Sequence, residues 1–452
     1  MRESSISKSD ARHALVFCAL FIAFGAAFYK IAQHPPSVIF QLPASFSHDG
    51  EQKMGASQYS TAALGIRTHF VSTQQNISTH AASLVEIGDG HIRAFWFAGS
   101  REGAQDVEIR SAVFDPEKNQ WSAEHSVANR ADTQQALRRY VKKLGNPVAL
   151  RATDGTLWLF YVTVSLGGWA GSSITAITSN DDGNTWSSAR RLITSPFINV
   201  STLVKGEPFS YADGTIGLPV YHELIGKFGE LLRIGKDGEV LDKQRLSSGR
   251  FSLQPVVLIK NPQQALVLMR YSGEKPGRVI ATSTDDAGQH WSAPVKTNLA
   301  NPNAAIAGVA LPDERIVMAL NNTEEGRDTL SLLLSSDGGA HWKFLYQLED
   351  QRGSSTEPTR YAQLASDLAQ ATEAGITDAA AYAKSAQRIQ CRDQRCGFEF
   401  SYPYLVQTQN GDFHLVYTWN RSFIKHVQFT RAWLDQQMEK ATKENLTHAK
   451  PH

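Results

Sequence analysis

One eight-residue pattern constrains this chain more than any other feature, because it occurs three times. The pattern is S/T-x-D-x-G-x-x-W, with copies at 179–186, 284–291 and 335–342. Its Asp side chain can accept hydrogen bonds from backbone N–H groups a few residues further on, which folds a tight turn. Its Gly supplies a positive φ that other residues resist, and its Trp buries a large apolar area over the turn. Three copies at near-regular spacing indicate a repeat architecture.

A second repeat runs out of step with the first and consists of two apolar segments joined by a Gly, Asn or Asp turn. Alternation with β-branched and aromatic residues favours strands, and the turn residues favour hairpins. The repeat length of roughly 50 residues fits a four-stranded propeller blade. The sequence therefore predicts an all-β fold, a six-bladed β-propeller over residues 56–430. Its six hairpins are expected at 82–97, 146–162, 207–223, 254–270, 308–322 and 402–419.

The N-terminus differs in composition from the rest of the chain. Residues 14–29 are apolar throughout, and Arg2, Lys8 and Arg12 precede them. Basic residues before an apolar segment favour a cytoplasmic N-terminus. We expect residues 1–32 to form a cytoplasmic tail and a transmembrane signal anchor, with the body periplasmic or on the cell surface. A cleaved signal peptide, which would release a secreted protein, and a buried soluble helix are the alternatives.

Three further segments lie outside the hairpin pattern. Residues 33–55 are typical of a linker, 353–396 of a helical insertion between blades five and six, and 431–452 of a C-terminal helix and tail. A local disulfide between Cys391 and Cys396 is expected in an exported protein. The net charge of +1 does not favour a nucleic-acid partner. No metal or other cofactor is expected.

The turn motif and the hairpins resemble the sialidase (neuraminidase) superfamily, whose turns are called Asp boxes. The resemblance covers about residues 75–430 and implies an active site on the propeller axis, at the starts of the inner strands. Residues 98–109 (AGSREGAQDVEI) resemble the loop that carries the family's general acid/base, and Asp106 is the match. A carboxyl group there can protonate a glycosidic oxygen; a solvated loop Asp is the alternative. Arg101 is a candidate substrate contact, or forms an ion pair with Glu102.

The resemblance also implies a nucleophile and a carboxylate-binding site. Residues 401–405 (SYPYL) resemble the strand start that carries the family's Tyr nucleophile, and Tyr402 is the match. The family holds a substrate carboxylate with three arginines, because planar guanidinium groups match its geometry. Arg270 and Arg327 match the second and third of them. A core Tyr and two surface salt bridges are the alternatives.

Two positions depart from the family pattern. His80 stands where the family has its first arginine, and Gln254 stands where the family has the Glu that deprotonates the Tyr. Gln254 cannot act as a base, so nearby arginines would have to favour ionised Tyr402. His80 is a candidate clamp or proton shuttle, or a buried core imidazole. Glu207, in an E-P pattern one blade early, and Asn146, at a strand start, are further candidates for substrate binding.

The resemblance implies a sialidase-like exo-glycosidase that acts on a terminal acidic sugar of an extracytoplasmic glycan. One alternative is a uronate polysaccharide lyase, in which the arginines neutralise the carboxylate and Tyr402 or His80 moves the C5 proton. The other is a non-catalytic, glycan-binding propeller. A hydrolase releases a reducing sugar and a lyase releases a product that absorbs ultraviolet light, whereas a binding module releases neither.

Overall fold

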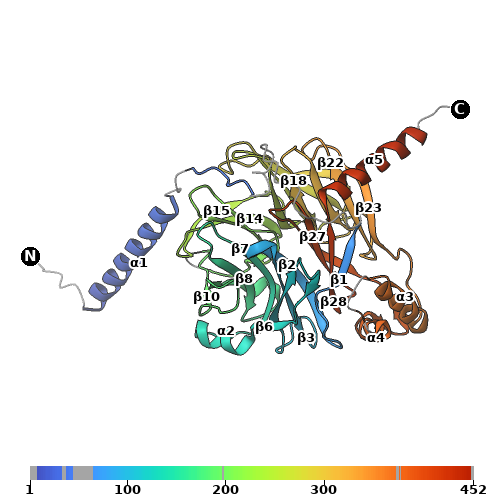
Figure 1. The fold of residues 1–452 in the computed structure, drawn as a ribbon. Coiled ribbons are helices and arrows are strands. Elements are labelled where there is room, and N and C mark those ends of the chain that lie inside the picture. Colours follow the sequence, from blue (N-terminus) through green and yellow to red (C-terminus); the bar gives the residue numbers. More distant parts are fainter. Residues whose placement is uncertain are drawn as a thin grey trace, which may run out of the picture.

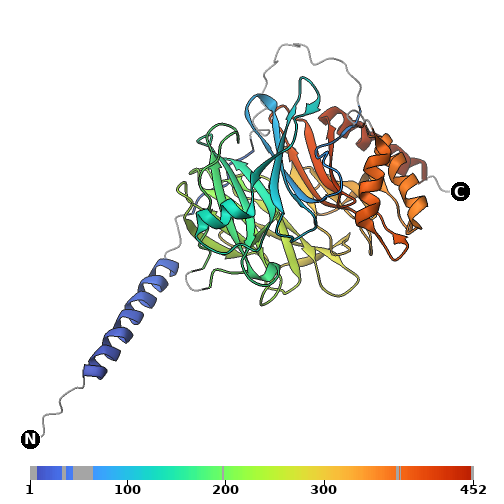
Figure 2. The same ribbon diagram turned by 90° about the horizontal axis from the view of Figure 1, so that it is seen from below.

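The computed structural model describes residues 8–32, 37–43, 65–195, 198–372, 376 and 378–448. Six antiparallel sheets of four or five strands stand around one axis (Figure 1 and Figure 2). Neighbouring blades contact one another in chain order, and blade six contacts blade one. The predicted six-bladed β-propeller is confirmed.

Blades one to three each begin with the strand or strands nearest the axis and proceed outwards. The second strands of blades one and two are buried along their whole length, because a neighbouring blade covers each face. The strands are β2 (Ser78–Glu86), β3 (Ile92–Gly99), β4 (Glu108–Asp115), β5 (Gln120–Trp121) and β6 (His125–Ala128) in blade one; β7 (Lys143–Arg151), β8 (Leu157–Val164), β9 (Ser172–Ser179) and β10 (Arg190–Arg191) in blade two; and β11 (Leu203–Val204), β12 (Phe209–Ser210), β13 (Ile216–His222), β14 (Phe228–Ile234) and β15 (Val240–Arg245) in blade three.

Blades four to six follow the same order, except that the outer strand of blade six comes from the N-terminal side. That strand pairs antiparallel with β28, and this pairing closes the ring. The strands are β16 (Ser252–Ile259), β17 (Ala265–Tyr271), β18 (Arg278–Thr284) and β19 (Val295–Ala300) in blade four; β20 (Ala307–Ala310), β21 (Ile316–Leu320), β22 (Thr329–Ser335) and β23 (Lys343–Asp350) in blade five; and β26 (Phe400–Gln407), β27 (Phe413–Trp419), β28 (Phe423–Phe429) and β1 (Arg67–Phe70) in blade six.

The three Asp-box turns form through local hydrogen bonds, as the motif predicts. In blade two, Asp181 Oδ1 accepts from the backbone N–H of Thr185 at 2.8 Å, and Ser179 Oγ accepts from the N–H of Gly183 at 2.8 Å. The turns of blades four and five repeat both bonds with their own Asp and Thr or Ser. These residues therefore organise the ends of the third strands.

A bulge interrupts the inner strand of four blades and directs side chains towards the axis. The strand register shifts in β2, β7, β16 and β26, and an extra residue in each adopts a positive φ. Positive φ is uncommon outside glycine, and bulges are common beside active sites. Blades three and five also have a positive-φ residue near the inner-strand start. The six residues are Ala81, Asn146, Ser201, Gln254, Asn303 and Tyr402.

The helices lie outside the sheets. In each blade, the loop that leads into the inner strand and the loop that joins the second strand to the third lie at the same end of the propeller. α2, between blades one and two, and α3 and α4, between blades five and six, are at this end, the lower one in Figure 1. Cys391 and Cys396 form a disulfide within the small β24–β25 hairpin. The bounds are α1 (Lys8–Ala32), α2 (Arg130–Leu137), α3 (Pro358–Gln370), α4 (Ala379–Gln390), α5 (Arg431–His448), β24 (Cys391–Arg392) and β25 (Arg395–Cys396), with 3-10 turns at Gly88–Gly90 and Trp169–Gly171.

The N-terminal region corrects one expectation. Within the part of the chain that the structure describes, no helix is both long and apolar enough to cross a membrane. The predicted transmembrane segment is therefore not supported. Residues 37–43, inside the expected linker, pack on the propeller: Phe40 is buried, pairs with Tyr211, and its N–H donates to the carbonyl of Pro262 at 2.8 Å. The other residues of that expected linker lie outside the described residues.

Candidate active site

Tyr402 lies at the centre of the site because the bulge in β26 directs it towards the axis. Gln254 Nε2 donates to the Tyr402 hydroxyl at 3.3 Å, and Arg270 Nη1 approaches the same oxygen at 3.5 Å. Arg270 Nη1 also donates to Gln254 Oε1 at 3.2 Å. A guanidinium can only donate, so it fixes the amide orientation and leaves the Gln254 NH₂ facing Tyr402. Two donors thus converge on one phenolic oxygen.

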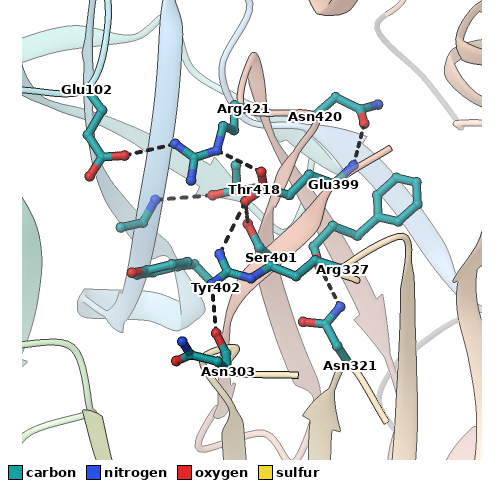
Figure 3. A network of polar contacts seen from close by, with 12 residues as sticks. Glu102, Asn303, Asn321, Arg327, Glu399, Ser401, Tyr402, Thr418, Asn420 and Arg421 are labelled. Carbon is teal, nitrogen blue, oxygen red and sulfur yellow. Dashed lines mark hydrogen bonds and ion pairs between the residues drawn. The ribbon is translucent and has the colours of Figure 1, made fainter. Parts of the chain in front are cut away.

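Arg270 and Arg327 come from different blades and are oriented by the same residue. Arg270 Nε donates to Asn303 Oδ1 at 2.7 Å, and Arg327 Nη2 donates to the Asn303 carbonyl at 2.8 Å. Asn303 is the positive-φ residue of blade five, so the local backbone presents its side chain and carbonyl to both guanidinium groups. Figure 3 shows Arg327, Asn303 and Tyr402 together. The structure therefore places the two predicted arginines on one side of Tyr402.

His80 lies directly beneath Tyr402, with 4.2 Å between the two ring centres. The imidazole is only 2% exposed. Burial, reinforced by the positive charge of Arg421, lowers the pKa of His80 to about 3. His80 is therefore uncharged near neutral pH and cannot replace a guanidinium as a carboxylate clamp. Its geometry fits the alternative of a core imidazole that supports Tyr402.

Arg421 is a site residue that the sequence pattern did not reveal. It lies in the turn between β27 and β28, its Nε donates to Glu399 Oε2 at 2.7 Å, and its Nη1 donates to Glu102 Oε2 at 2.8 Å (Figure 3). Glu399 also accepts from Ser401 Oγ at 2.7 Å and pairs with Arg327 at 3.5 Å. Arg421 thus brings a third guanidinium beside Tyr402. It lies close to His80, which is itself uncharged.

The acidic partners of Arg421 remain ionised despite their partial burial. Burial opposes ionisation of Glu399 most strongly, but the charge and hydrogen bond of Arg421 act together with the neighbouring positive groups, Arg327 among them, and the pKa of this carboxyl falls to about 2. Glu102 is also held by Trp169, whose Nε1 donates to Glu102 Oε1 at 3.2 Å. Arg421 and Arg327 pair with these two carboxylates, whereas Arg270, within the described residues, contacts neither of them, so the three guanidinium groups and two carboxylates together carry one formal positive charge that can attract an anion. No single motif contains these five residues, which is why sequence reasoning did not assemble them.

Asp106 and Arg101 are in the loop between β3 and β4, at the end of the propeller that bears the site. Asp106 accepts hydrogen bonds from the N–H and the hydroxyl of Ser100, both at 2.9 Å. Both residues are exposed. In the described part of the chain, neither makes a hydrogen bond or ion pair with Tyr402, Gln254, Arg270 or Arg327. The structure thus puts Asp106 on the expected loop but not in the central cluster.

Asn146 and Glu207 lie in blades two and three, at the margin of the cluster. Asn146 is buried, and its Nδ2 donates to the hydroxyl of Tyr221 at 3.2 Å. That hydroxyl also interacts with Gln254. Burial raises the pKa of Glu207 to about 8. Within the described residues, no group of three or more His, Cys, Asp or Glu side chains is arranged to hold a metal ion.

The fold and this cluster define a sialidase-like β-propeller. The chain belongs to the BNR repeat-like domain family, whose model matches residues 90–415. No curated protein matches the chain.

Several solved structures share the fold at low identity. The Hadza microbial sialidase Hz136 is 16% identical with a TM-score of 0.57, over 78% of this chain and 66% of that one. A protein of unknown function from Dyadobacter fermentans is 13% identical with a TM-score of 0.57, over 81% of this chain and 100% of that one. The intramolecular trans-sialidase from Ruminococcus gnavus is 11% identical with a TM-score of 0.55, over 79% of this chain and 95% of that one. At these identities the likeness is one of fold.

Proposed function

We propose that this protein is a sialidase-like exo-glycosidase that hydrolyses a terminal acidic sugar, with Tyr402 as nucleophile. The observation that carries the proposal is the convergence of Arg270 and Gln254 on the phenolic oxygen. A neutral phenol needs an acceptor for its proton, whereas a phenolate needs donors. Hydrogen bonding to the charged form favours that form. The surroundings of Tyr402 therefore suit an attacking oxygen.

The substrate carboxylate would bind Arg270, Arg327 and Arg421. Guanidinium groups recognise carboxylates through paired N–H donors, and these bonds are stronger than neutral ones. Asn303 orients the first two arginines, and Glu102 and Glu399 orient the third. The remaining positive charge favours an acidic sugar over a neutral one.

The reaction would proceed in two displacements with retention of configuration. Tyr402, having released its proton to solvent, forms a bond to the anomeric carbon while the bond to the leaving oxygen breaks. Asp106 gives its proton to that oxygen. Asp106 then takes a proton from water, which attacks the anomeric carbon and releases Tyr402. Gln254 serves as a hydrogen-bond donor to the phenolic oxygen rather than as a base.

The test is a panel of glycans that carry terminal sialic acids, uronic acids or neutral sugars, scored for two kinds of product. The proposal expects a reducing acidic sugar from at least one acidic glycan, and loss of that product in Tyr402→Phe. An ultraviolet-absorbing unsaturated product would indicate a uronate lyase. Glycan binding without any product would indicate a binding module, and either outcome contradicts the proposal.

A further inference from the structure

A lysine from blade three reaches across the propeller axis to the strand that carries Tyr402. Lys205 Nζ donates to the carbonyl of Pro403 at 3.0 Å, although 198 residues separate the two in sequence. Lys205 is 4% exposed, so water screens this contact weakly. Blades three and six are opposite one another in a six-bladed ring. The contact therefore joins the two sides of the ring directly beside the nucleophile.

The hydrogen bond between Lys205 and Pro403 lies next to a strained segment of backbone. Tyr402 has a φ of 54° at the register shift in β26, a conformation that is unfavourable for residues other than glycine and persists only when neighbouring contacts enforce it. Two polar contacts flank it: Ser401 Oγ donates to Glu399, and the Pro403 carbonyl accepts from Lys205. Pro403 cannot donate a backbone hydrogen bond and fixes its own φ. Lys205 therefore restrains the C-terminal side of the bulge.

Lys205 also places a positive charge beside the aromatic rings of blade six. Its Nζ lies 5.8 Å from the ring centre of Tyr402 and 4.9 Å from that of Tyr404. A cation near an aromatic face is attracted by it, and the attraction grows when the ring carries negative charge. Arg270 contacts the hydroxyl end of the same ring, so the phenol lies between two cations.

We propose that Lys205 is a positioning residue for Tyr402: it ties the bulge to the opposite blade, and its charge stabilises the ionised phenol. This inference rests on the proposed role of Tyr402 as nucleophile. It supplies a physical reason why the enzyme works with Gln254 in place of a carboxylate base.

Burial lowers the pKa of Lys205 to about 7. The charged form therefore predominates below that pH and is lost as pH rises through it. Tyr402 and Tyr404 from blade six face Lys205, and Glu207, from the same blade as Lys205, interacts with Tyr404. The part of turnover that depends on the Lys205 charge should accordingly be lost as pH rises through about 7.

The first experiment compares Lys205→Met and Lys205→Arg with Lys343→Met, an exposed lysine of β23. Lys205→Met should lower kcat by about 10–100-fold with a much smaller change in KM, because misplacing a reacting group by about 1 Å costs about 100-fold. The ratio of kcat between the unaltered protein and Lys205→Met should fall as pH rises through about 7. Lys205→Arg, which stays charged, should recover most of the rate, and its kcat ratio to Lys205→Met should not fall near pH 7. Unaltered kcat and an unaltered pH profile in Lys205→Met would overturn the proposal.

The second experiment does not require activity and so separates this inference from the proposed function. Amide hydrogen exchange of residues 400–407 is compared in the unaltered protein, Lys205→Met and Lys343→Met. Exchange in this segment should rise at least several-fold in Lys205→Met alone, while exchange elsewhere changes little. Equal protection from exchange in all three proteins would show that Lys205 does not restrain β26, even if glycan hydrolysis is established. If exchange is faster in Lys205→Met but the unaltered protein hydrolyses no glycan, the restraint of β26 by Lys205 is supported and the role of Tyr402 as nucleophile is rejected.

Discussion

At the scale of single residues, Gln254 determines which hydrogen-bonding group faces the hydroxyl of Tyr402. Its amide is oriented by Arg270 so that a donor, not an acceptor, faces the phenol. A Glu at this position would have the same length, would accept from Arg270, and would be able to take the phenolic proton. The chain therefore combines the proposed nucleophile with a neighbour that would stabilise its ionised form but could not generate it.

The first prediction concerns Gln254→Glu. The new carboxylate should act as a base for Tyr402, so kcat/KM for an acidic glycoside should hold or rise, most clearly below pH 7. Steady-state kinetics beside Gln254→Ala, which offers neither donor nor acceptor, measures this. A uronate lyase would respond in the opposite way, because a carboxylate beside the substrate carboxylate repels it. Weaker substrate binding in Gln254→Glu would thus contradict the glycosidase assignment.

The second prediction concerns Arg421. Arg421→Met should raise KM for an acidic sugar by roughly 10–100-fold, as expected for loss of a charged hydrogen-bond pair. The KM of Arg421→Lys should lie between those of the unaltered protein and Arg421→Met, because lysine keeps the charge but lacks the planar guanidinium group. The matched substrate is the carboxamide of the same sugar, which should be nearly insensitive to the substitution. Thermal unfolding checks that Glu399, left without its main partner, has not disrupted the fold. Equal losses on acid and carboxamide would contradict a carboxylate contact.

At the scale of elements, the Asp-box turns and the inner-strand bulges show how far sequence reasoning extends. The turns were predictable because Ser179, Asp181 and Gly183 bond to one another within five residues. The bulges were not, because a positive φ at Gln254 or Tyr402 is enforced by contacts between blades. Arg421 escaped prediction for the same reason: its partners Glu102 and Glu399 are distant in sequence.

The candidate site likewise contains residues that local sequence patterns identify and properties that they do not reveal. Tyr402, Gln254, Arg270 and Arg327 come together as the resemblance implied, because each stands at a strand or loop position that a hairpin repeat identifies. His80 was also placed beside them, but its charge state depends on burial that no local pattern reveals. Asp106 stays a prediction as the acid/base, since within the described residues its hydrogen bonds are both with Ser100.

The third prediction belongs to the junction between blades five and six. Glu349 of β23 pairs with Lys425 of β28 at 2.9 Å and accepts from Tyr417 at 2.6 Å, all in the interior. Glu349→Gln leaves the ammonium buried without a counter-charge and should lower the free energy of unfolding by about 3–5 kcal/mol. Urea denaturation measures it. The double variant Glu349→Gln, Lys425→Met removes both charges and should recover part of the loss. No recovery would show that the pair is not the cause.

At the scale of the whole molecule, the ring is closed by two segments from opposite ends of the chain. Strand β1 supplies the outer edge of the C-terminal blade, with Arg67 opposite Gln428 and Phe70 opposite Lys425. The hairpin repeat did not predict this strand, because it lies outside the repeat and becomes a strand only by pairing with β28. Ring closure buries a histidine cluster between blades six and one: His69, His414 and His426, with Trp121 donating to His426 at 3.2 Å.

The fourth prediction concerns acid stability. Burial lowers the pKa of His414 to about 3 and that of His426 well below its usual value. Such groups stabilise the fold above the unfolded pKa of about 6.5, and this stabilisation is lost as pH falls below it. Each contributes a slope of about 1.4 kcal/mol per pH unit between pH 6 and 5. Glu207, whose pKa is raised to about 8, contributes with the opposite sign.

The slope attributable to one histidine is obtained by difference. Urea denaturation at several pH values between 6 and 5 should give a shallower dependence for His414→Gln than for the unaltered protein, by about 1.4 kcal/mol per pH unit. His13→Gln, on the exposed surface of α1, serves as the control and should leave the slope unchanged. An unchanged slope in His414→Gln would show that this histidine does not titrate with unfolding.

The most direct test of the central proposal is to trap the sugar on Tyr402. In Asp106→Asn, an activated aryl glycoside of the acidic sugar still reacts with the nucleophile, because its leaving group needs little protonation. Release then stalls, because Asp106 would be the base that activates water. Mass spectrometry of the digested protein should show one glycosyl unit on the peptide that contains Tyr402, with a burst of one aryl equivalent. A burst with the sugar on another residue, or turnover with no adduct and an unsaturated product, would contradict a Tyr402-dependent glycosidase.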